Sequence, residues 1–400
     1  MTEVRAMCDA EAHSGAVPSP SAEQRVERLD AASPDAGRAW DTFVGSRPDA
    51  CLAHAFGWGR TIERTYGRRA HDLVVWRQGT LAGVLPLVEV RSRLFGSSLT
   101  SMPYLDVAGP LATDDRARET LVQAACELAR ELGVATLDLR ALGRPAFAGP
   151  SSRQKVTLVL ELGDDVDTLW KAIGPKPRNQ VRKAEKSGLT TRRSGAEGIA
   201  GFYRVYAINM RDLGSPPHRR GWFEAIFAQF GDAAACHLVE LDGTVIGGLI
   251  AIDQGDTVTV PWASCERRHF RLCPNNLLYW ETFRAAIERG QRRFDFGRSS
   301  RGSGTYRFKR QWGATETTLC WQVIDPRRVD AATLVARSPV HPGAHAAAGT
   351  PDAAGDGATA AADDGGGIST RRALAARLWQ RLPVPVATWL GTRLRGGITL

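Results

Sequence analysis

The strongest constraint on the fold is one hairpin pattern that occurs twice in the chain. Val75–Val88 reads VWRQGTLAGVLPLV, and Val239–Ile252 reads VELDGTVIGGLIAI. Three positions recur with the same spacing: Gly79, Gly83 and Leu85 in the first copy, Gly243, Gly247 and Leu249 in the second. Gln-Gly and Asp-Gly favour tight hairpin turns, because glycine accepts a positive φ. The pattern predicts two β-hairpins of the same design.

The elements expected around each hairpin repeat as well. Each hairpin follows helical patterns and precedes a strand, a helix and a further strand. The helices are expected at Phe56–Tyr66 and Asp115–Leu132, and then at Ile199–Leu213, Gly221–Phe230 and Asn276–Arg289; the strands are expected at Thr136–Arg140 and Arg293–Phe296. This shared order favours a duplicated α/β domain over two unrelated units. We expect the copies to span residues 37–150 and 151–328.

A length of 400 residues is consistent with two domains and flanking tails. Residues 1–36 contain little to bury, and residues 338–367 are of low complexity, rich in Ala, Gly and Asp. We expect a disordered N-terminal tail and a disordered linker. Residues 369–395 regain helical periodicity and carry arginines without an acid. This basic amphipathic segment can lie on an anionic membrane or dock on the protein itself.

The net charge of +9 favours polyanionic partners. The seven cysteines are scattered without a CxxC pair, so neither a disulfide framework nor a metal site is expected. No stretch reaches transmembrane length and no signal peptide is visible, so we expect a cytoplasmic protein. The basic segment adds the hypothesis of peripheral contact with the inner membrane face.

Two basic stretches are candidate binding sites. Lys171–Gly188 predicts a helix on which Arg178, Arg182 and Lys186 form a stripe, which can hold phosphate or a tRNA backbone or can be a solvated face. Phe294–Thr315 fits neither the Walker nor the dinucleotide motif. We expect a mobile loop at Gly297–Gly304, followed by a strand that alternates aromatic and cationic residues.

Four segments carry a family resemblance: CPNNLLYWETFRAAIERGQRRFDFGRSSRGSGTYRFKRQWGA, LWKAIGPKPRNQVRKAEKSGL, NMRDLGSPPHRRGWFEAIF and MPYLDVAGPL. Together they resemble the FemAB-like acyltransferases, and with the Leu-Pro-Val-Pro-Val tail they resemble most the subgroup associated with PEP-CTERM/exosortase exopolysaccharide systems. The resemblance implies an α/β (α+β) chain of tandem GNAT-like acyltransferase domains with mixed central sheets. It also implies an N-acyltransferase that forms an amide on an amine of a cell-envelope or exopolysaccharide precursor.

In that family the Phe-Lys pair of the last motif helps to bind the phosphorylated acceptor, which maps onto Phe308 and Lys309. Asp106 is a candidate general base, on the expectation that burial raises its pKa, or else a turn-forming residue. Tyr279 and Tyr306 are candidate proton relays or packed tyrosines. The remaining candidates for substrate binding are Arg298, Arg178, Arg182, Asn209 and Arg211.

No cofactor is expected, because the acyl donor is a co-substrate. No Gln/Arg-x-x-Gly-x-Gly/Ala loop precedes Asn276, and no long heptad segment is present, so aminoacyl-tRNA and acyl-CoA both remain candidate donors. The expected acceptor is a phosphorylated, nucleotide-linked or lipid-linked glycan or peptide. The alternative is a non-catalytic RNA- or membrane-binding protein with a degenerate acyltransferase fold.

Overall fold

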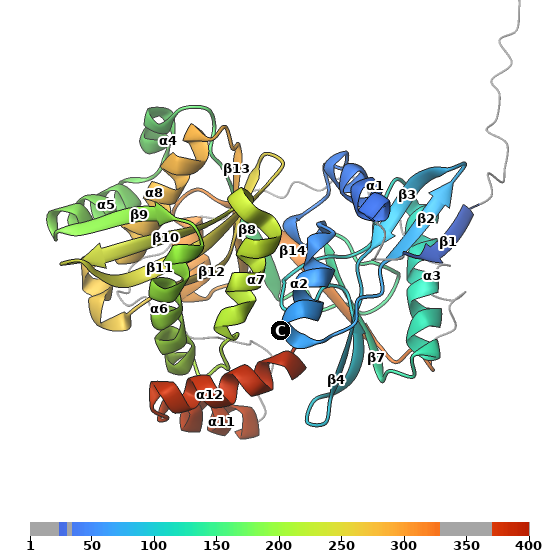
Figure 1. The fold of residues 1–400 in the computed structure, drawn as a ribbon. Coiled ribbons are helices and arrows are strands. Elements are labelled where there is room, and N and C mark those ends of the chain that lie inside the picture. The colour runs from blue at the N-terminus through green and yellow to red at the C-terminus, as the bar shows by residue number, and fades with distance from the viewer. Residues whose placement is uncertain (1–23, 30–33, 329–369, 400) are drawn as a thin grey trace, which may run out of the picture.

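The computed structural model describes residues 24–29, 34–328 and 370–399, which form two α/β halves side by side and a C-terminal helical segment (Figure 1). The elements of the N-terminal half are β1 (Gln24–Arg28), α1 (Pro34–Gly45), η1 (Leu52–His54), α2 (Gly57–Tyr66), β2 (Leu73–Arg77), β3 (Thr80–Leu85), β4 (Val88–Ser92), β5 (Gly96–Thr100), β6 (Leu111–Ala112), α3 (Asp115–Glu131) and β7 (Thr136–Leu142).

The second half likewise has two α-helices leading into its hairpin and a helix followed by a strand after it, and its hairpin strands are longer. Its elements are β8 (Lys155–Glu161), α4 (Val166–Ala172), α5 (Pro175–Lys186), β9 (Leu189–Ser194), η2 (Ala196–Gly198), α6 (Ile199–Asp212), α7 (Arg220–Phe230), η3 (Gly231–Ala233), β10 (Ala234–Leu241), β11 (Thr244–Gln254), β12 (Thr257–Cys265), η4 (Arg267–Leu272), α8 (Pro274–Glu288), β13 (Arg293–Ser300), α9 (Gly304–Arg310) and β14 (Thr315–Ile324). Alternate strand residues bury opposite faces of this half's sheet, one against α5 and α8, the other against α6 and α7.

Strand β14 joins the two halves into one sheet. Its first residues pair with β8 and its last residues pair with β7, both antiparallel. The resulting ten-stranded mixed sheet has the order β4-β5-β7-β14-β8-β13-β12-β11-β10-β9, and a four-stranded sheet has the order β1-β2-β3-β6. A shared core also crosses the junction, where Trp58 of α2 packs on Trp222 of α7 at 5.9 Å between ring centroids.

The duplicated hairpin is confirmed at the level of register. In β2–β3 the ladder steps from Val75↔Gly83 to Trp76↔Leu81 through a bulge. In β10–β11 it steps in the same way from Val239↔Gly247 to Glu240↔Val245. The turn residues also match, since Gln78 and Asp242 both have a φ of 50° and each precedes a glycine with a positive φ. The two sequence copies therefore fold into hairpins with equivalent turns and bulges.

The C-terminal segment is docked on the body. Helices α11 (Thr370–Gln380) and α12 (Val384–Leu394) lie against α6, and the turn η5 (Arg395–Gly397) follows (Figure 1). The packing is close at Gly391, where an added Cβ would lie 3.1 Å from the Pro217 nitrogen. It is also close at Gly214, which lies next to Ala376. Docking on the protein itself, one of the two alternatives, is observed, and it leaves one face of the segment exposed.

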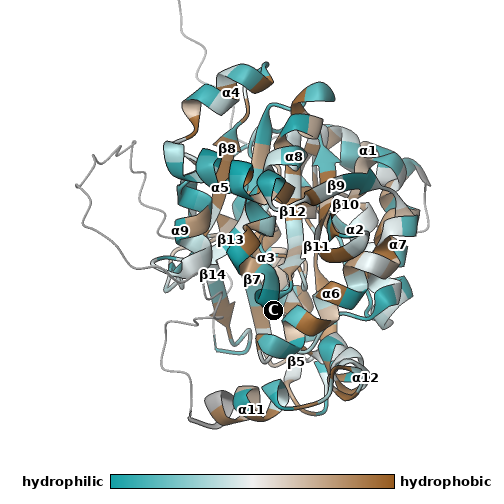
Figure 2. Cartoon of the chain, turned by 90° about the vertical axis from the view of Figure 1, so that its left-hand side faces the viewer, coloured by the Kyte–Doolittle hydropathy of each residue, from teal (hydrophilic) through white to brown (hydrophobic). Residues whose placement is uncertain are grey.

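The outer face of this segment remains apolar and basic. Its exposed apolar side chains are Leu374, Leu378, Val386 and Trp389, and its exposed cations are Arg377, Arg381 and Arg393. Figure 2 shows hydrophobic residues along both helices. No helix formed by the described residues has both the length and the apolar character needed to cross a membrane.

Two expectations from the sequence are wrong. Residues 24–28, assigned to a disordered tail, form β1, whose backbone completes the edge of β2 and whose Glu27 accepts a 2.6 Å hydrogen bond from Trp76 Nε1. The loop expected at Gly297–Gly304 starts as the end of β13, and the strand expected around Lys309 is helix α9. The expected linker at 338–367 lies outside the described residues.

Candidate active site

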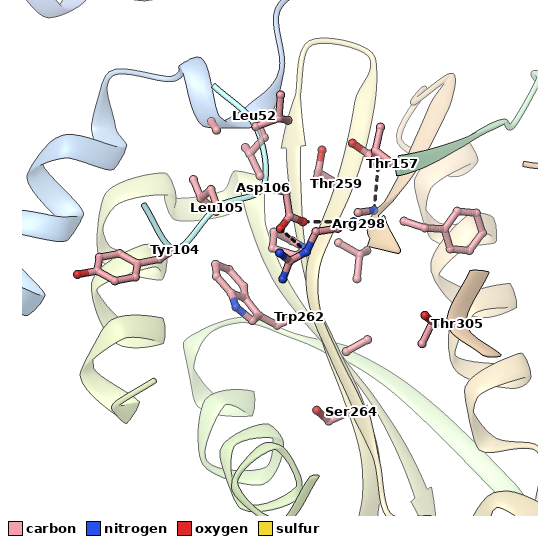
Figure 3. Close-up of a pocket in the computed structure, with 18 of the residues that line it drawn as sticks. Leu52, Tyr104, Leu105, Asp106, Thr157, Thr259, Trp262, Ser264, Arg298 and Thr305 are labelled. Atoms are coloured by element: carbon pink, nitrogen blue, oxygen red, sulfur yellow. Dashed lines mark hydrogen bonds and ion pairs between the residues drawn. The ribbon is translucent and has the colours of Figure 1, made fainter. Parts of the chain in front are cut away.

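A cavity of about 340 Å³ opens where β12 and β13 separate, between the two halves of the chain. The two strands pair in parallel only through Thr257–Thr259 and Arg293–Asp295, and then diverge. A loop of the N-terminal half, around Tyr104–Val107, lines the opposite wall (Figure 3). The splay leaves main-chain polar groups of both strands without a strand partner, so side chains or a ligand must satisfy them.

Five of the predicted site residues meet in this cavity. They are Asp106, Asn209, Tyr279, Arg298 and Lys309, contributed by the N-terminal loop, α6, α8, β13 and α9. Residues far apart in the sequence thus converge at the point where the sheet opens, which is a common position for a ligand site.

Asp106 reaches across the cavity to β13. Its Oδ1 lies 3.1 Å from Arg298 Nε, and its Oδ2 accepts a 3.2 Å hydrogen bond from the Arg298 main-chain N–H (Figure 3). The guanidinium of Arg298 also covers Trp321, at 5.2 Å from the ring centroid. The burial expected for Asp106 is not found, because its side chain is 31% exposed at the mouth of the splay.

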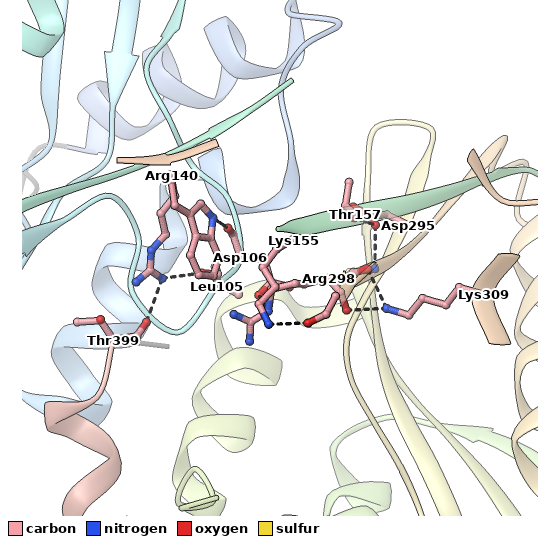
Figure 4. A network of polar contacts seen from close by, with 12 residues as sticks. Leu105, Asp106, Arg140, Lys155, Thr157, Asp295, Arg298, Lys309 and Thr399 are labelled. Carbon is pink, nitrogen blue, oxygen red and sulfur yellow. Dashed lines mark hydrogen bonds and ion pairs between the residues drawn. The ribbon is translucent and has the colours of Figure 1, made fainter. Parts of the chain in front are cut away.

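Lys309 points back from α9 onto the diverging strand. Its Nζ donates 2.8 Å hydrogen bonds to the carbonyls of Gly297 and Arg298, which the splay leaves unpaired (Figure 4). Burial lowers the pKa of Lys309 to about 8, against the opposing effect of Asp106 and Asp295. Lys309 therefore both supports β13 and places a titratable cation at the cavity.

Asp295, which the sequence analysis did not select, is the second carboxylate of the cavity. Its Oδ1 accepts hydrogen bonds from the Thr157 hydroxyl and from the Gly297 N–H, the latter at 2.8 Å. The other carboxylate oxygen of Asp295, Oδ2, takes part in neither of these hydrogen bonds. Burial raises the pKa of Asp295, only partly offset by these hydrogen bonds and by Lys309. The available signal was the Asp-Phe-Gly run at the end of the strand predicted at Arg293–Phe296.

The other predicted residues lie outside the cavity lining. The Tyr306 hydroxyl bonds Glu316, which raises the pKa of Tyr306, and Phe308 packs on Tyr279 at 5.3 Å between ring centroids. Arg182 of α5 covers the ring of Trp170 in α4, and Arg178 lies on the same helix as Arg182. Arg211 pairs with Asp212 and donates to the Leu382 carbonyl of the C-terminal segment.

Cys51 and His54 also form a close pair at the cavity, with 3.2 Å between Cys51 Sγ and His54 Nδ1. The Nδ1 atom already accepts the Cys51 main-chain N–H at 3.0 Å, and Nε2 donates to the Gly109 carbonyl. Burial raises the pKa of the Cys51 thiol to about 12. A thiol in this state is a poor nucleophile, so the pair caps η1 and does not form a Cys–His catalytic dyad.

Comparison with known proteins agrees with this architecture. Residues 176–310 match the model of the acetyltransferase (GNAT) domain. The crystal structure of FemX is similar with a TM-score of 0.58 and 16% identity, covering 76% of this chain and 98% of that one. A tandem GNAT protein from the clavulanic acid biosynthesis pathway gives 0.52 and 16%, covering 77% and 100%. No curated protein matches the chain.

The chain therefore has a tandem GNAT fold with a matched acyltransferase-type domain in its second half. At these identities the structural likeness establishes the fold, and the likeness to FemX agrees with the FemAB resemblance at that level.

Gly297, the glycine of the Asp-Phe-Gly strand end, is predicted to be important for the stability of the fold. Gly297 has a φ of +70°, and a Cβ there would lie 3.2 Å from the Val260 carbonyl oxygen and 3.6 Å from Asp106 Oδ2. Gly297→Ala is expected to lower the free energy of unfolding by about 1–3 kcal/mol in urea titrations. Gly290→Ala is the matched control, because Gly290 has a φ of +81° with open space around it. Equal losses in the two variants would contradict a role of crowding at the splay.

Proposed function

We propose that the protein is an N-acyltransferase that forms an amide on an amine of a cell-envelope or exopolysaccharide precursor. The observation that supports this most is the cavity at the splay, where Asp295, Lys309 and Arg298 converge in a GNAT-type domain. The cavity between the diverging strands therefore has a carboxylate that can accept a proton and cations that can stabilise a developing negative charge. The degenerate binding-protein alternative has less support, since these polar groups are retained.

Amide formation requires that a neutral amine attacks an activated acyl carbonyl and loses a proton. Asp295 fits the role of the base, because burial raises its pKa toward the range in which a carboxylate accepts a proton effectively. Lys309 is placed to stabilise the oxyanion that develops on the carbonyl, through its charge in a partly desolvated site. The bond between the acyl carbon and the donor's leaving atom breaks, its electron pair stays with the leaving group, and the leaving group takes up the proton that Asp295 accepted from the amine.

Asp106 and Arg298 are proposed to bind and orient substrate at the mouth of the cavity. Their ion pair spans the two halves, so a ligand that displaces one partner from the other would link substrate binding to the position of the N-terminal loop. Tyr279 and Asn209 also line the cavity, and a 3.0 Å hydrogen bond to Ser264 orients Asn209. The donor can be an aminoacyl-tRNA or an acyl-CoA, and the acceptor a phosphorylated or lipid-linked glycan or peptide.

Mass spectrometry can test the transfer directly. Purified protein is incubated with cell extract that contains isotope-labelled amino acids or labelled acyl-CoA, and small molecules are compared with an extract lacking the protein. We expect one amine-bearing precursor to gain the mass of a labelled acyl group. The label that appears identifies the donor. Labelled extracts with no protein-dependent product would contradict the proposed function.

The exposed face of the C-terminal segment supports a proposed peripheral contact with anionic membrane. Its apolar and cationic side chains lie together on the outer side of α11 and α12, as in helices that rest on a lipid surface. In flotation with phosphatidylserine-containing vesicles, Leu378→Glu combined with Trp389→Glu is expected to lower the bound fraction at least about tenfold. The control is Leu94→Glu, an exposed leucine on the β4–β5 turn. Binding that survives the double substitution would contradict the proposal.

A further inference from the structure

The C-terminal segment contributes a side chain to the cavity wall. After α12, the turn η5 places Arg395 among the residues that line the cavity, opposite the diverging strands. Arg395 is more than sixty residues in sequence from β14, and no motif of the GNAT domain includes it. The site is thus built from both halves and from the segment that follows them.

The segment is fixed to the N-terminal loop by main-chain hydrogen bonds. The Gly396 carbonyl accepts 3.0 Å bonds from the Tyr104 hydroxyl and from Arg68 Nε. The Thr399 carbonyl accepts 3.0 Å bonds from the Tyr104 N–H and from an Arg140 nitrogen (Figure 4). Tyr104 has a φ of 71°, which is unfavourable for an aromatic residue and persists only where surrounding contacts hold it. The cavity wall formed by this loop therefore depends on the docked segment.

The guanidinium of Arg395 contacts the neutral imidazole of His218. Its nitrogens lie 3.0 and 3.2 Å from His218 Nε2, and His218 Nδ1 lies 2.6 Å from the Tyr66 hydroxyl. Burial and the arginine hold the pKa of His218 well below its usual range, so Nε2 acts as the acceptor. Among residues 24–29, 34–328 and 370–399, no carboxylate forms an ion pair with Arg395.

The other cavity arginines differ from Arg395 in this respect. Arg298 is paired with Asp106, and Arg140 is paired with Asp138 at 2.8 Å. The surroundings of Arg395 are aromatic, since Tyr66, Tyr104 and Tyr206 all lie close enough to affect its pKa, which burial lowers. A partly desolvated cation without a counter-charge is costly, and an incoming anion would remove that cost.

We propose that Arg395 forms an anion subsite that binds a carboxylate of a substrate. The fork of a guanidinium matches a carboxylate with two parallel hydrogen bonds. The Tyr206 hydroxyl, which lines the cavity and accepts the His218 main-chain N–H, keeps its own proton to donate another. Arg395 has no carboxylate partner among the described residues, so one negative charge would balance it, which favours a carboxylate over a doubly charged phosphate. The assignment of this carboxylate to a donor or an acceptor rests on the proposed acyl transfer; the binding itself does not.

Saturation-transfer NMR on the full chain can test the subsite with acetate as the probe. Acetate is expected to receive saturation from the wild-type protein, and acetamide, which has nearly the same shape without the charge, is expected not to. Arg395→Met should weaken acetate binding at least about tenfold. Arg393→Met is the matched control, because Arg393 is exposed on the same segment and its contacts are with Trp389, whose ring it covers and whose carbonyl accepts a 3.0 Å hydrogen bond from it.

A second variant keeps the test decisive if Arg395→Met fails to fold. Arg395→Lys retains the charge and loses the fork, so it should bind acetate several-fold more weakly than wild type with circular dichroism unchanged. Equal acetate binding in wild type and both Arg395 variants would overturn the subsite, and unfolding of both would make Arg395 a structural residue. Displacement of acetate by equimolar inorganic phosphate would overturn the choice of a carboxylate.

The acetate-binding test of Arg395 and the acyl-transfer test of the proposed function can fail independently of each other. Acetate binding through Arg395 with no labelled product would contradict the acyl transfer and leave the subsite intact. Acyl transfer that Arg395→Met leaves unchanged at low substrate concentration would contradict the subsite alone.

Discussion

Asp295→Asn is expected to lower the rate of acyl transfer about 100- to 10,000-fold, the usual contribution of a general base. The substitution keeps the shape of the side chain and its acceptor oxygen for Thr157 and Gly297, so the strand end should be preserved. Because burial raises the pKa of Asp295, the wild-type rate should also show an acidic limb above the usual titration range of an aspartate. Steady-state rates between about pH 4 and pH 9 measure both effects.

Asp106→Asn is the matched comparison in the same cavity. Asp106 is already engaged by Arg298, so its loss should raise KM more than it lowers kcat. A larger fall in kcat for Asp106→Asn than for Asp295→Asn would contradict the assignment of the base to Asp295 and favour the assignment made from the sequence.

Lys309→Met is expected to lower kcat about 100- to 1,000-fold, since it removes the cation proposed to stabilise the oxyanion. Because the pKa of Lys309 is about 8, the wild-type rate should fall as pH rises through that value, when the ammonium is lost. Lys309→Arg should move this alkaline limb upward, because the guanidinium stays protonated. An unchanged limb in Lys309→Arg would show that another group is responsible.

The stability of the same variants should depend on pH with a defined sign. The folded state holds the pKa of Lys309 at about 8, below its unfolded value of 10.5, so the unfolded chain binds more protons between these values. The cost of burying the charge is therefore present below pH 8 and is relieved as pH rises. Relative to Lys309→Met, wild-type stability should increase by roughly 3 kcal/mol across that window. A flat difference in urea titrations would contradict the burial of a charged Lys309.

The hairpins could be predicted because their signals are local. Gln-Gly and Asp-Gly fix the turns, and the shared Gly-Thr-x-x-Gly-x-Leu spacing fixes the register, down to a bulge at equivalent positions. The helices around them also lie within a few residues of their expected bounds, as with α8 at Pro274–Glu288. Long apolar periodicity and glycine at the C-terminal ends supply that accuracy.

The error at Gly297–Gly304 has a long-range cause. The glycines and serines there are typical of loops, but residues 298–300 pair with β8, which comes from a part of the chain more than 140 residues earlier. Ser303 then accepts the Tyr306 N–H at 3.2 Å and starts α9, so Lys309 is helical and buried. The N-cap was readable from Ser303; the strand pairing before it was not.

The set of residues that line the cavity also depends on contacts between parts of the chain that are far apart in the sequence. Asp295 and Lys309 line the same cavity only because β13 separates from β12 and α9 folds back over it. Arg395 enters through a docked segment that composition alone predicted equally well to lie on a membrane. Charge and periodicity gave the types of residue available, and tertiary packing decided which of them meet.

The most direct test of the account is to fill the cavity without changing any titratable group. Thr259 lies on β12 at the point of separation, and Thr259→Trp should occupy the space where the reacting groups are proposed to meet. Thr257→Trp, two residues earlier on the same strand and outside the cavity lining, is the control. With both variants folded, the labelled amide product should disappear for Thr259→Trp and persist for Thr257→Trp. Product formation by Thr259→Trp at the wild-type rate would place the reaction elsewhere on the protein.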